Sequence, residues 1–265
     1  MNPKHEANRL HWDLAADRWR ALRDRDGLWM KCHLEPELAF EGGALEEIRR
    51  SLEDLQGKSV CVVGSGDNYA AFALAGCGAV VTSVDISQRQ LDVGADRATR
   101  LGLAIEFVRA DASDLSVLPA TGFDLVTSTN GFFVWIADPG QVFREVMRIL
   151  RPGGAYVFYD VHPFQRPWAD DTFALTMAKP YWDVTSDDDN ETFQHHWTLA
   201  DLLNPMAAAG FRIDSIRETP PRDGRFWQDG AYEPAADKRL FDWRHNSLAG
   251  LPAWLVVRAS KPSMA

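Results

Sequence analysis

The sequence has few cysteines, no long apolar run and no excess of basic residues, and each absence excludes a class of protein. Its three cysteines, Cys32, Cys61 and Cys77, are odd in number and follow no disulfide or metal-ligand spacing. We expect them to be small buried hydrophobic residues, and we expect no metal site. No apolar stretch reaches the length of a membrane span, and the first ten residues contain no apolar signal core. The sequence therefore indicates a soluble, cytoplasmic protein.

Acidic residues outnumber basic ones, 38 to 28, which gives a net charge of −10 without any sustained lysine or arginine stripe. A nucleic-acid partner requires a positive surface, so we expect none. We expect a small-molecule substrate, no membrane partner, and a monomer or homodimer. Because 46% of the 265 residues are hydrophobic, the chain is able to bury a full core as one large domain.

One stretch, residues 60–87, has the pattern of a nucleotide-binding unit. An apolar β-branched run breaks into Gly64-Ser65-Gly66, resumes as an alanine-rich helical pattern, and is followed by a second apolar run that ends in Asp85. Glycine allows a backbone to approach a ligand closely, and the following helix offers free N–H groups. Asp85 lies twenty-one residues beyond Gly64, near the usual distance for a carboxylate that binds ribose hydroxyls.

Strand and helix patterns alternate through the first part of the chain, which predicts a doubly wound α/β fold with a mostly parallel, seven-stranded sheet. The expected cofactor-binding core is 58–160, within a single domain. The N-terminal helices, 1–57, are predicted to form a lid. Two irregular, aromatic segments are predicted to be substrate caps, 161–197 and 218–250. The predicted strands are 60–63, 80–84, 104–108, 125–128, 155–159, 211–216 and 252–259.

The first helix is predicted over 8–25, where apolar residues recur at helical spacing. Its expected buried face consists of Leu10, Leu14, Ala15, Trp19 and Leu22.

The glycine turn does not fit a dinucleotide well. The dinucleotide fingerprint G-x-G-x-x-G requires a small third residue so that the helix packs on the strand. Tyr69 occupies that position. A nicotinamide-dependent oxidoreductase is therefore disfavoured.

Several segments together give a more specific pattern. The chain resembles the class I S-adenosylmethionine-dependent methyltransferases, which have a Rossmann-like fold. In this family a Pro-Gly-Gly turn precedes the fifth strand, and Leu150-Arg151-Pro152-Gly153-Gly154 reproduces it. The resemblance covers roughly residues 58–160 and implies S-adenosylmethionine as the cofactor. The matching segments are VCVVGSGDN, TSVDIS, FVRADASDL, FDLVTSTNGFFVWIADP and RILRPGGAYVFYD.

The resemblance also implies roles for individual residues. The turn would pass under the methionine and ribose of the cofactor, Asp85 would accept from the ribose hydroxyls, and Asp111 would accept from the adenine amino group. Asn68 departs from the pattern because many relatives have a glycine there, although asparagine tolerates unusual backbone angles. The full predicted cofactor set is Gly64, Ser65, Gly66, Asn68, Asp85, Ile86 (packing on adenine), Ala110, Asp111, Ala112 and Asn130 (near the amino-acid end).

The outer segments resemble small-molecule methyltransferases, in Val161-His162-Pro163-Phe164 and in the helix start at Trp197-Thr198-Leu199. His162 follows the fifth strand and is the candidate general base; the alternative is that it only hydrogen-bonds its own loop. Each other candidate for the substrate pocket has an equally simple packing role. These candidates are Trp19, Phe132, Phe133 and His196, together with His162.

The predicted function is transfer of a methyl group from S-adenosylmethionine to a small acceptor at O, N or C. The aromatic caps favour a flat aromatic or polycyclic acceptor. Three alternatives remain. A nucleic-acid methyltransferase is disfavoured, because such enzymes usually have an (N/D)-P-P-(Y/F) turn after the fourth strand and this chain has Thr129-Asn130-Gly131-Phe132 there. The others are an oxidoreductase and a protein that binds the cofactor without transferring its methyl group, for example a cyclase.

Overall fold

The structure is a computed structural model that describes residues 2–169, 173–185, 192–227 and 233–263. In these residues seven strands form one sheet, in the order β3-β2-β1-β4-β5-β7-β6. The first five strands are parallel, and β7 runs antiparallel to both β5 and β6. The predicted doubly wound, mostly parallel sheet is confirmed. The strands are β1 Ser59–Val63, β2 Val80–Asp85, β3 Ile105–Arg109, β4 Phe123–Ser128, β5 Leu150–Val161, β6 Arg212–Thr219 and β7 Trp254–Ser260.

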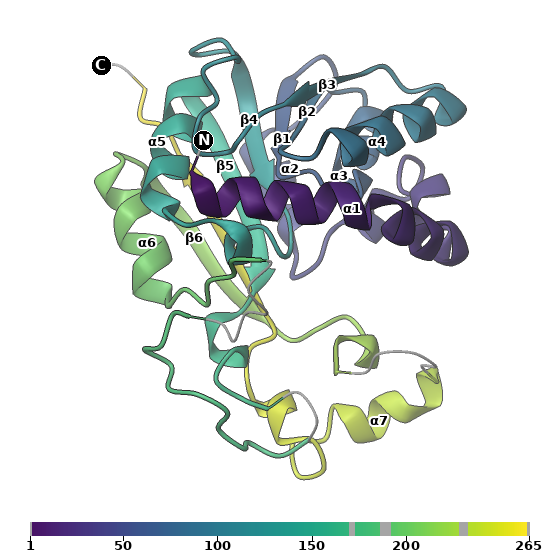
Figure 1. The fold of residues 1–265 in the computed structure, drawn as a ribbon, viewed down its shortest axis with the longest axis vertical. Helices are drawn as coiled ribbons and strands as arrows, with labels where there is room; N and C mark the ends of the chain where they lie inside the picture. Colours follow the sequence, from purple (N-terminus) through teal and green to yellow (C-terminus); the bar gives the residue numbers. More distant parts are fainter. Residues whose placement is uncertain (1, 170–172, 186–191, 228–232, 264–265) are drawn as a thin grey trace.

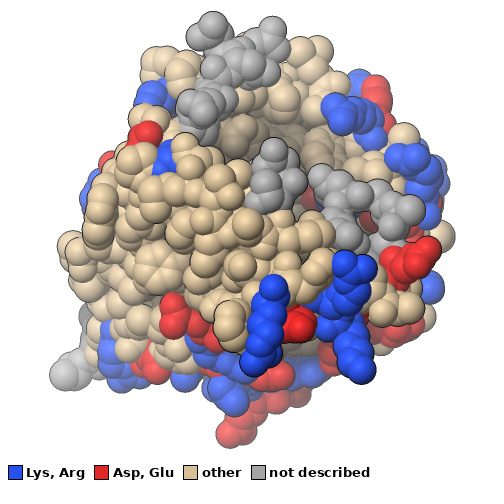
Figure 2. Space-filling model, turned by 90° about the horizontal axis from the view of Figure 1, so that it is seen from below, with Lys and Arg blue, Asp and Glu red and all other residues tan. Residues whose placement is uncertain are grey.

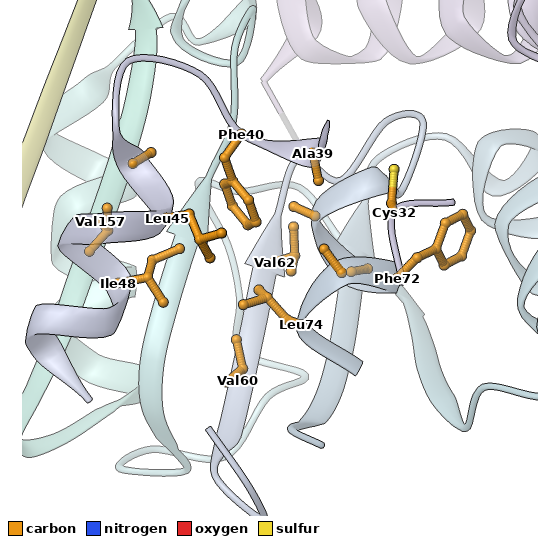
Figure 3. Close-up of a cluster of buried hydrophobic side chains, with 14 of the residues drawn as sticks. Cys32, Ala39, Phe40, Leu45, Ile48, Val60, Val62, Phe72, Leu74 and Val157 are labelled. Atoms are coloured by element: carbon orange, nitrogen blue, oxygen red, sulfur yellow. The ribbon is translucent and has the colours of Figure 1, made fainter. Parts of the chain in front are cut away.

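Helices cover both faces of this sheet, which produces two apolar layers. One layer joins α2 and α3 to β1, and Figure 3 shows Leu45 and Ile48 of α2 and Leu74 of α3 beside Val60 and Val62 of β1. The other layer joins α5 and α6 to the opposite face. The helices are α1 Pro3–Asp26, α2 Ala44–Ser51, α3 Tyr69–Gly76, α4 Gln88–Leu101, α5 Pro139–Ile149, α6 Leu199–Ala208 and α7 Asp237–Leu240.

Three helices begin where their capping residues predict. The Ser87 side chain accepts from the Gln90 backbone N–H. The side chain of Asp138, which precedes Pro139, accepts from the Gln141 backbone N–H. Thr198 forms a full capping box with Asp201. Local sequence therefore fixes the entry of α4, α5 and α6.

The predicted apolar face of the first helix is largely wrong. Leu14 is 86% exposed and Leu10 is 50% exposed, whereas His5 and Asn8 are buried. The physical reason is that α1 crosses in front of the sheet (Figure 1), where hydrogen bonds from His5 and Asn8 and the packing of Trp12 on Trp135 set which side of the helix faces inward. Asn8, for example, donates to the Phe193 carbonyl and accepts from the Phe193 N–H, each at 2.8 Å.

The fifth strand is longer than predicted. The Pro152-Gly153-Gly154 turn lies inside β5, because Leu150 already pairs with Phe123 and regular pairing resumes at Ala155 after a register shift. Both predicted cap segments lie at the lower end of Figure 1, and part of each lies outside the described residues. Of the cysteines, Cys32 and Cys61 are buried as predicted, while Cys77 is half-buried.

Candidate active site

A cavity of about 820 Å³ opens at the carboxyl ends of the parallel strands. The chain runs from β1 outward to β3 and then crosses back to β4, so β1 and β4 form the switch point where doubly wound folds bind ligands. Ligand cavities are typically about 300–1,000 Å³, so this one has room for a nucleotide-sized group and a second small molecule. The face seen in Figure 2 is hollowed, and mostly uncharged side chains surround the hollow.

The glycine turn after β1 lines this cavity, but its first glycine serves packing as well. Gly64 has φ +69°, and a Cβ there would lie 2.2 Å from the Phe132 ring. Gly66 has φ +46° and open space around it, so only its backbone angle favours glycine. The close approach inferred from the sequence is therefore made at Gly64 by an aromatic side chain of the protein.

Asn68 adopts the left-handed conformation expected for the glycine that it replaces, with φ +64°. Its side chain is buried away from the cavity, where it donates to the Gly66 carbonyl at 2.8 Å and accepts from the Ser83 hydroxyl at 2.6 Å. Asn68 thus shapes the turn from behind, and the structure does not bring it into the predicted cofactor set.

Asp85 ends β2 with its carboxylate at the cavity wall. Its two oxygens accept from the backbone N–H groups of Gly66 and Ser87, each at 2.9 Å. Burial raises the pKa of Asp85, and these N–H groups oppose that shift. A carboxylate has about four acceptor positions, so two remain for ribose hydroxyls.

Asp111, after β3, is held by a residue that the sequence did not single out. The buried His5 of α1 places Nδ1 at 2.9 Å from one Asp111 oxygen, while its Nε2 accepts from the Ala137 backbone N–H at 3.0 Å. Nδ1 therefore carries the proton and donates to Asp111. Burial raises the pKa of Asp111, but hydrogen bonds from His5 and Ser113 outweigh it and lower the pKa overall. His5 fastens the N-terminal helix directly to the predicted adenine site.

The loop after β4 carries Asn130 and Phe132 into the cavity wall. Asp160, buried at the end of β5, fixes this loop by accepting from the N–H groups of Gly131 at 2.9 Å and Phe133 at 3.1 Å. Burial raises the pKa of Asp160, and these bonds counteract part of the shift. Asp160 is therefore a positioning residue for the loop.

Part of the cavity wall comes from residues outside the glycine turn and the β2, β3 and β4 strand ends, and we call this part the outer chamber. Its aromatic wall is Tyr159, Trp254 and Phe226, whose rings meet edge to face with centroids 5.9 Å and 5.1 Å apart. Such rings suit a flat apolar ligand. The remaining residues of this chamber are Leu28, Leu38, Ala39, Glu41, Val161, Pro221, Arg222, Asp223 and Arg225.

Apart from Asn68 and His162, the predicted site residues line one of two cavities. Gly64, Ser65, Gly66, Asp85, Ile86, Ala110, Asp111, Ala112 and Asn130 all line the main cavity, as do Trp19 and Phe132. Phe133 and His196 instead line a separate cavity of about 20 Å³ and do not reach the main one.

His162 is also absent from the cavity wall. It is fully buried, with Nε2 2.8 Å from Glu218 and Nδ1 accepting from the Phe164 N–H. Burial lowers the pKa of His162, and Glu218 opposes that change. The alternative stated for it, a residue that hydrogen-bonds its own loop, is the arrangement observed.

Sequence reasoning missed the polar residues of the outer chamber. Glu41 and Arg222 lie in segments without a recognisable motif, 181 positions apart in the chain. The one available signal is Gly42-Gly43, which marks a sharp turn directly after Glu41.

Within the described residues, no three His, Cys, Asp or Glu side chains cluster to hold a metal ion, and no helix is long and apolar enough to cross a bilayer.

Comparisons with known proteins agree with this geometry. Residues 61–158 match the family described as a methyltransferase domain. The chain is 30% identical over 145 residues to the ubiquinone biosynthesis O-methyltransferase of Bordetella avium, covering 54% of this chain and 58% of that one. The chain spans about half the length of the first curated relatives that it matches.

Solved structures share the fold over most of the chain. An S-adenosylmethionine-dependent methyltransferase from Mesorhizobium loti matches with a TM-score of 0.62 and 25% identity, over 81% of this chain and 96% of that one. The [4+2]-cyclase SpnF matches with a TM-score of 0.57 and 22% identity, over 83% of this chain and 80% of that one.

The sheet order and the strand-end cavity define a Rossmann-like protein with a nucleotide-type site. Residues 61–158 match a methyltransferase domain, and the fold is that of S-adenosylmethionine-dependent methyltransferases. S-adenosylmethionine is the cofactor that this family implies. The acceptors present fit this cofactor. Asp85 keeps free acceptor positions, and one Asp111 oxygen accepts only from His5.

Proposed function

We propose that this protein transfers the methyl group of S-adenosylmethionine to a hydroxyl oxygen of a small, flat, ring-containing molecule. The observation that carries the proposal is one continuous cavity with two chemically different parts. The strand-end part presents carboxylates and a glycine turn, and the outer chamber presents aromatic rings. Oxygen is favoured as the target atom because the curated relatives are named O-methyltransferases.

Each part of the cavity has its own task in this proposal. The turn at Gly64 to Gly66, with Asp85, Asp111 and Asn130, would hold the cofactor. When bound, the cofactor supplies an already activated methyl group, so the protein contributes mainly alignment and exclusion of water. Phe132 over the turn and the residues of α1 that line the cavity would exclude water from the reacting atoms.

The proposal is tested by incubating the full chain with S-adenosylmethionine labelled in its methyl group and a panel of hydroxylated benzoates and phenols. We expect label in the extracted organic product, with a mass gain of one methyl group, and at subsaturating cofactor about tenfold slower labelling with Asp85→Ala. Transfer to an amine or a ring carbon, but never to oxygen, would contradict the choice of atom.

A second function has one observation in its favour. The fold is shared with a [4+2]-cyclase, so the fold alone does not distinguish methyl transfer from other uses of the cavity. Tight cofactor binding without label transfer to any acceptor in the panel would favour this alternative.

A further inference from the structure

Within the part of the chain that the structure describes, one carboxylate of the cavity wall accepts no hydrogen bond. The cavity wall contains five carboxylates, and four of them already accept hydrogen bonds from the protein: Asp67 from Arg23, Asp85 from Gly66 and Ser87, Asp111 from His5 and Ser113, and Asp223 from Arg225. The fifth is Glu41. Among the described residues its side chain has only an ion-pair contact, 3.6 Å from Arg222. Glu41 is therefore the one of these five carboxylates that accepts no hydrogen bond from the described residues.

The backbone holds Glu41 in a fixed place beside the aromatic wall. Gly42 has φ +63°, and a Cβ there would lie 2.7 Å from Val256 and 2.9 Å from Trp254. The Ala44 N–H also donates to the Glu41 carbonyl at 3.0 Å, which closes the turn. Because a side chain at position 42 would overlap β7, glycine is required there, and the backbone of Glu41 is fixed next to this strand.

Tyr159 connects this turn to the cofactor half of the cavity. Its hydroxyl donates to the Ala39 carbonyl at 3.2 Å, two residues before Glu41. Burial and the Glu41 carboxylate raise the pKa of Tyr159, while the Asn130 backbone lowers it. Tyr159, Glu41 and Asn130 all line the same cavity, and Asn130 is predicted to meet the amino-acid end of the cofactor, where the methyl group is carried.

The charges around Glu41 suit a proton acceptor. Burial raises the pKa of Glu41, Asp223 raises it further, and Arg222 and Arg225 lower it. A carboxylate with a raised pKa is a better base at neutral pH than an ordinary glutamate. It is still a weak base, so the matching acceptor is an acidic hydroxyl such as a phenol or enol rather than an aliphatic alcohol.

We propose that Glu41 is the general base of the methyl transfer inferred above, acting on a phenolic or enolic acceptor in the outer chamber. This inference rests on the proposed function. The acceptor O–H bond breaks and its proton moves to a Glu41 oxygen. The acceptor oxygen forms a bond to the methyl carbon, and the C–S bond breaks with its electron pair left on sulfur. Arg222 is the positioning residue for Glu41.

The test compares Glu41→Gln with Glu37→Gln, using catechol as the acceptor, which is protonated at neutral pH, and 4-nitrocatechol as the spectroscopic probe. Glu37 is a matched control because it lies four positions earlier, is 62% exposed and pairs with Arg49 outside the cavity. We expect Glu41→Gln to lower kcat about 100-fold or more with little change in KM, as for loss of a general base. The acid limb of the pH–rate profile should also disappear. Glu37→Gln should match the wild type in both respects.

A second readout does not depend on turnover. The phenol and phenolate forms of 4-nitrocatechol absorb at different wavelengths, so its titration can be followed while it is bound. We expect the pKa of the bound probe to fall by about one unit in Glu41→Gln, because a neighbouring negative charge that disfavours phenolate is removed. Arg222 lowers the pKa of Glu41, so Arg222→Gln should raise that pKa and move the acid limb of the pH–rate profile to higher pH.

Three results would overturn the inference. They are a Glu41→Gln variant with wild-type kcat and probe titration, an unmoved acid limb in Arg222→Gln, and a wild type that binds S-adenosylmethionine but not 4-nitrocatechol. Each of these leaves the proposed methyl transfer standing. Failure of the wild type to bind S-adenosylmethionine would instead overturn the proposed function itself.

Discussion

The two halves of the cavity are built in different ways. In the cofactor half, Asp85 is the last residue of β2, and Asp111 and Asn130 lie two residues beyond β3 and β4, so the rigid sheet sets their positions. In the outer chamber the residues come from segments far apart in the chain, and ring contacts with Trp254 and the Gly42 turn hold them. The sheet therefore provides a fixed cofactor site, while the acceptor site depends on how the outer segments pack against it.

The most disruptive single change should be Gly64→Ala. Its Cβ would overlap the Phe132 ring at 2.2 Å, and alanine is disfavoured at φ +69°. We expect a loss of about 2–4 kcal/mol in the free energy of unfolding, combining overpacking and backbone strain. Denaturant titration measures it. Gly66→Ala is the control, because it has positive φ but open space, and should lose only about 1–2 kcal/mol. Equal losses would mean that Phe132 does not close over the turn.

The next largest effect should come from His5→Ala, which tests how α1 is fastened across the cofactor half. The change removes a donor to Asp111 and leaves the Ala137 N–H without its acceptor. Burying such unsatisfied groups costs about 1–3 kcal/mol, measurable by denaturant titration and by faster hydrogen exchange at Ala137. Leu14→Ala, on the exposed side of the same helix, should be close to neutral. A His5→Ala protein as stable as Leu14→Ala would show that α1 is held by other contacts.

Asp85→Ala sharpens the comparison by acting on one half only. Losing charge-assisted hydrogen bonds to the ribose should weaken S-adenosylmethionine binding at least tenfold, about 1.4 kcal/mol, in a calorimetric titration. Binding of 4-nitrocatechol in the outer chamber should hardly change. Asp92→Ala, an exposed residue of α4, is the control. Unchanged cofactor affinity in a folded Asp85→Ala protein would mean that the ribose contact is misassigned.

The smallest expected effect is that of Trp254→Phe in the outer chamber. Trp254 is buried, and its Nε1 has no hydrogen-bond partner among the described residues. The smaller ring loses buried apolar area, but the change also removes the cost of a buried N–H without an acceptor. The free energy of unfolding should therefore change by less than about 1 kcal/mol. Trp29→Phe is the matched control. Trp29 is equally buried but its Nε1 donates to Asp24, so it should lose more stability. The reverse order would show that the Trp254 N–H is satisfied in solution.

The difference between the two halves also explains what the sequence could predict. The strands, the helix caps and the predicted cofactor residues follow from local patterns, because an apolar run, a capping residue and the acid at a strand end lie next to one another in the chain. Asn68 is an instructive case: its backbone conformation was predictable, but its side chain turns toward Ser83 and away from the cavity.

The outer chamber could not be predicted in this way. Glu41, Tyr159 and Trp254 meet only because α2 and β7 pack against β5, and no local pattern records that contact. The buried face of α1 also does not follow from the spacing of its apolar residues. Hydrogen bonds from His5 and Asn8 help to decide which side of the helix faces inward. His162 follows a strand like the true wall residues, yet its ring pairs with Glu218 away from the cavity.

The most direct measurement is a calorimetric titration of the full chain with S-adenosylmethionine, run in parallel with NAD. We expect saturable binding of S-adenosylmethionine that weakens at least tenfold in Asp85→Ala, and no comparable binding of NAD, because Tyr69 replaces the third glycine that a dinucleotide requires. Tight binding of NAD with no response to S-adenosylmethionine would contradict the assignment of the cavity.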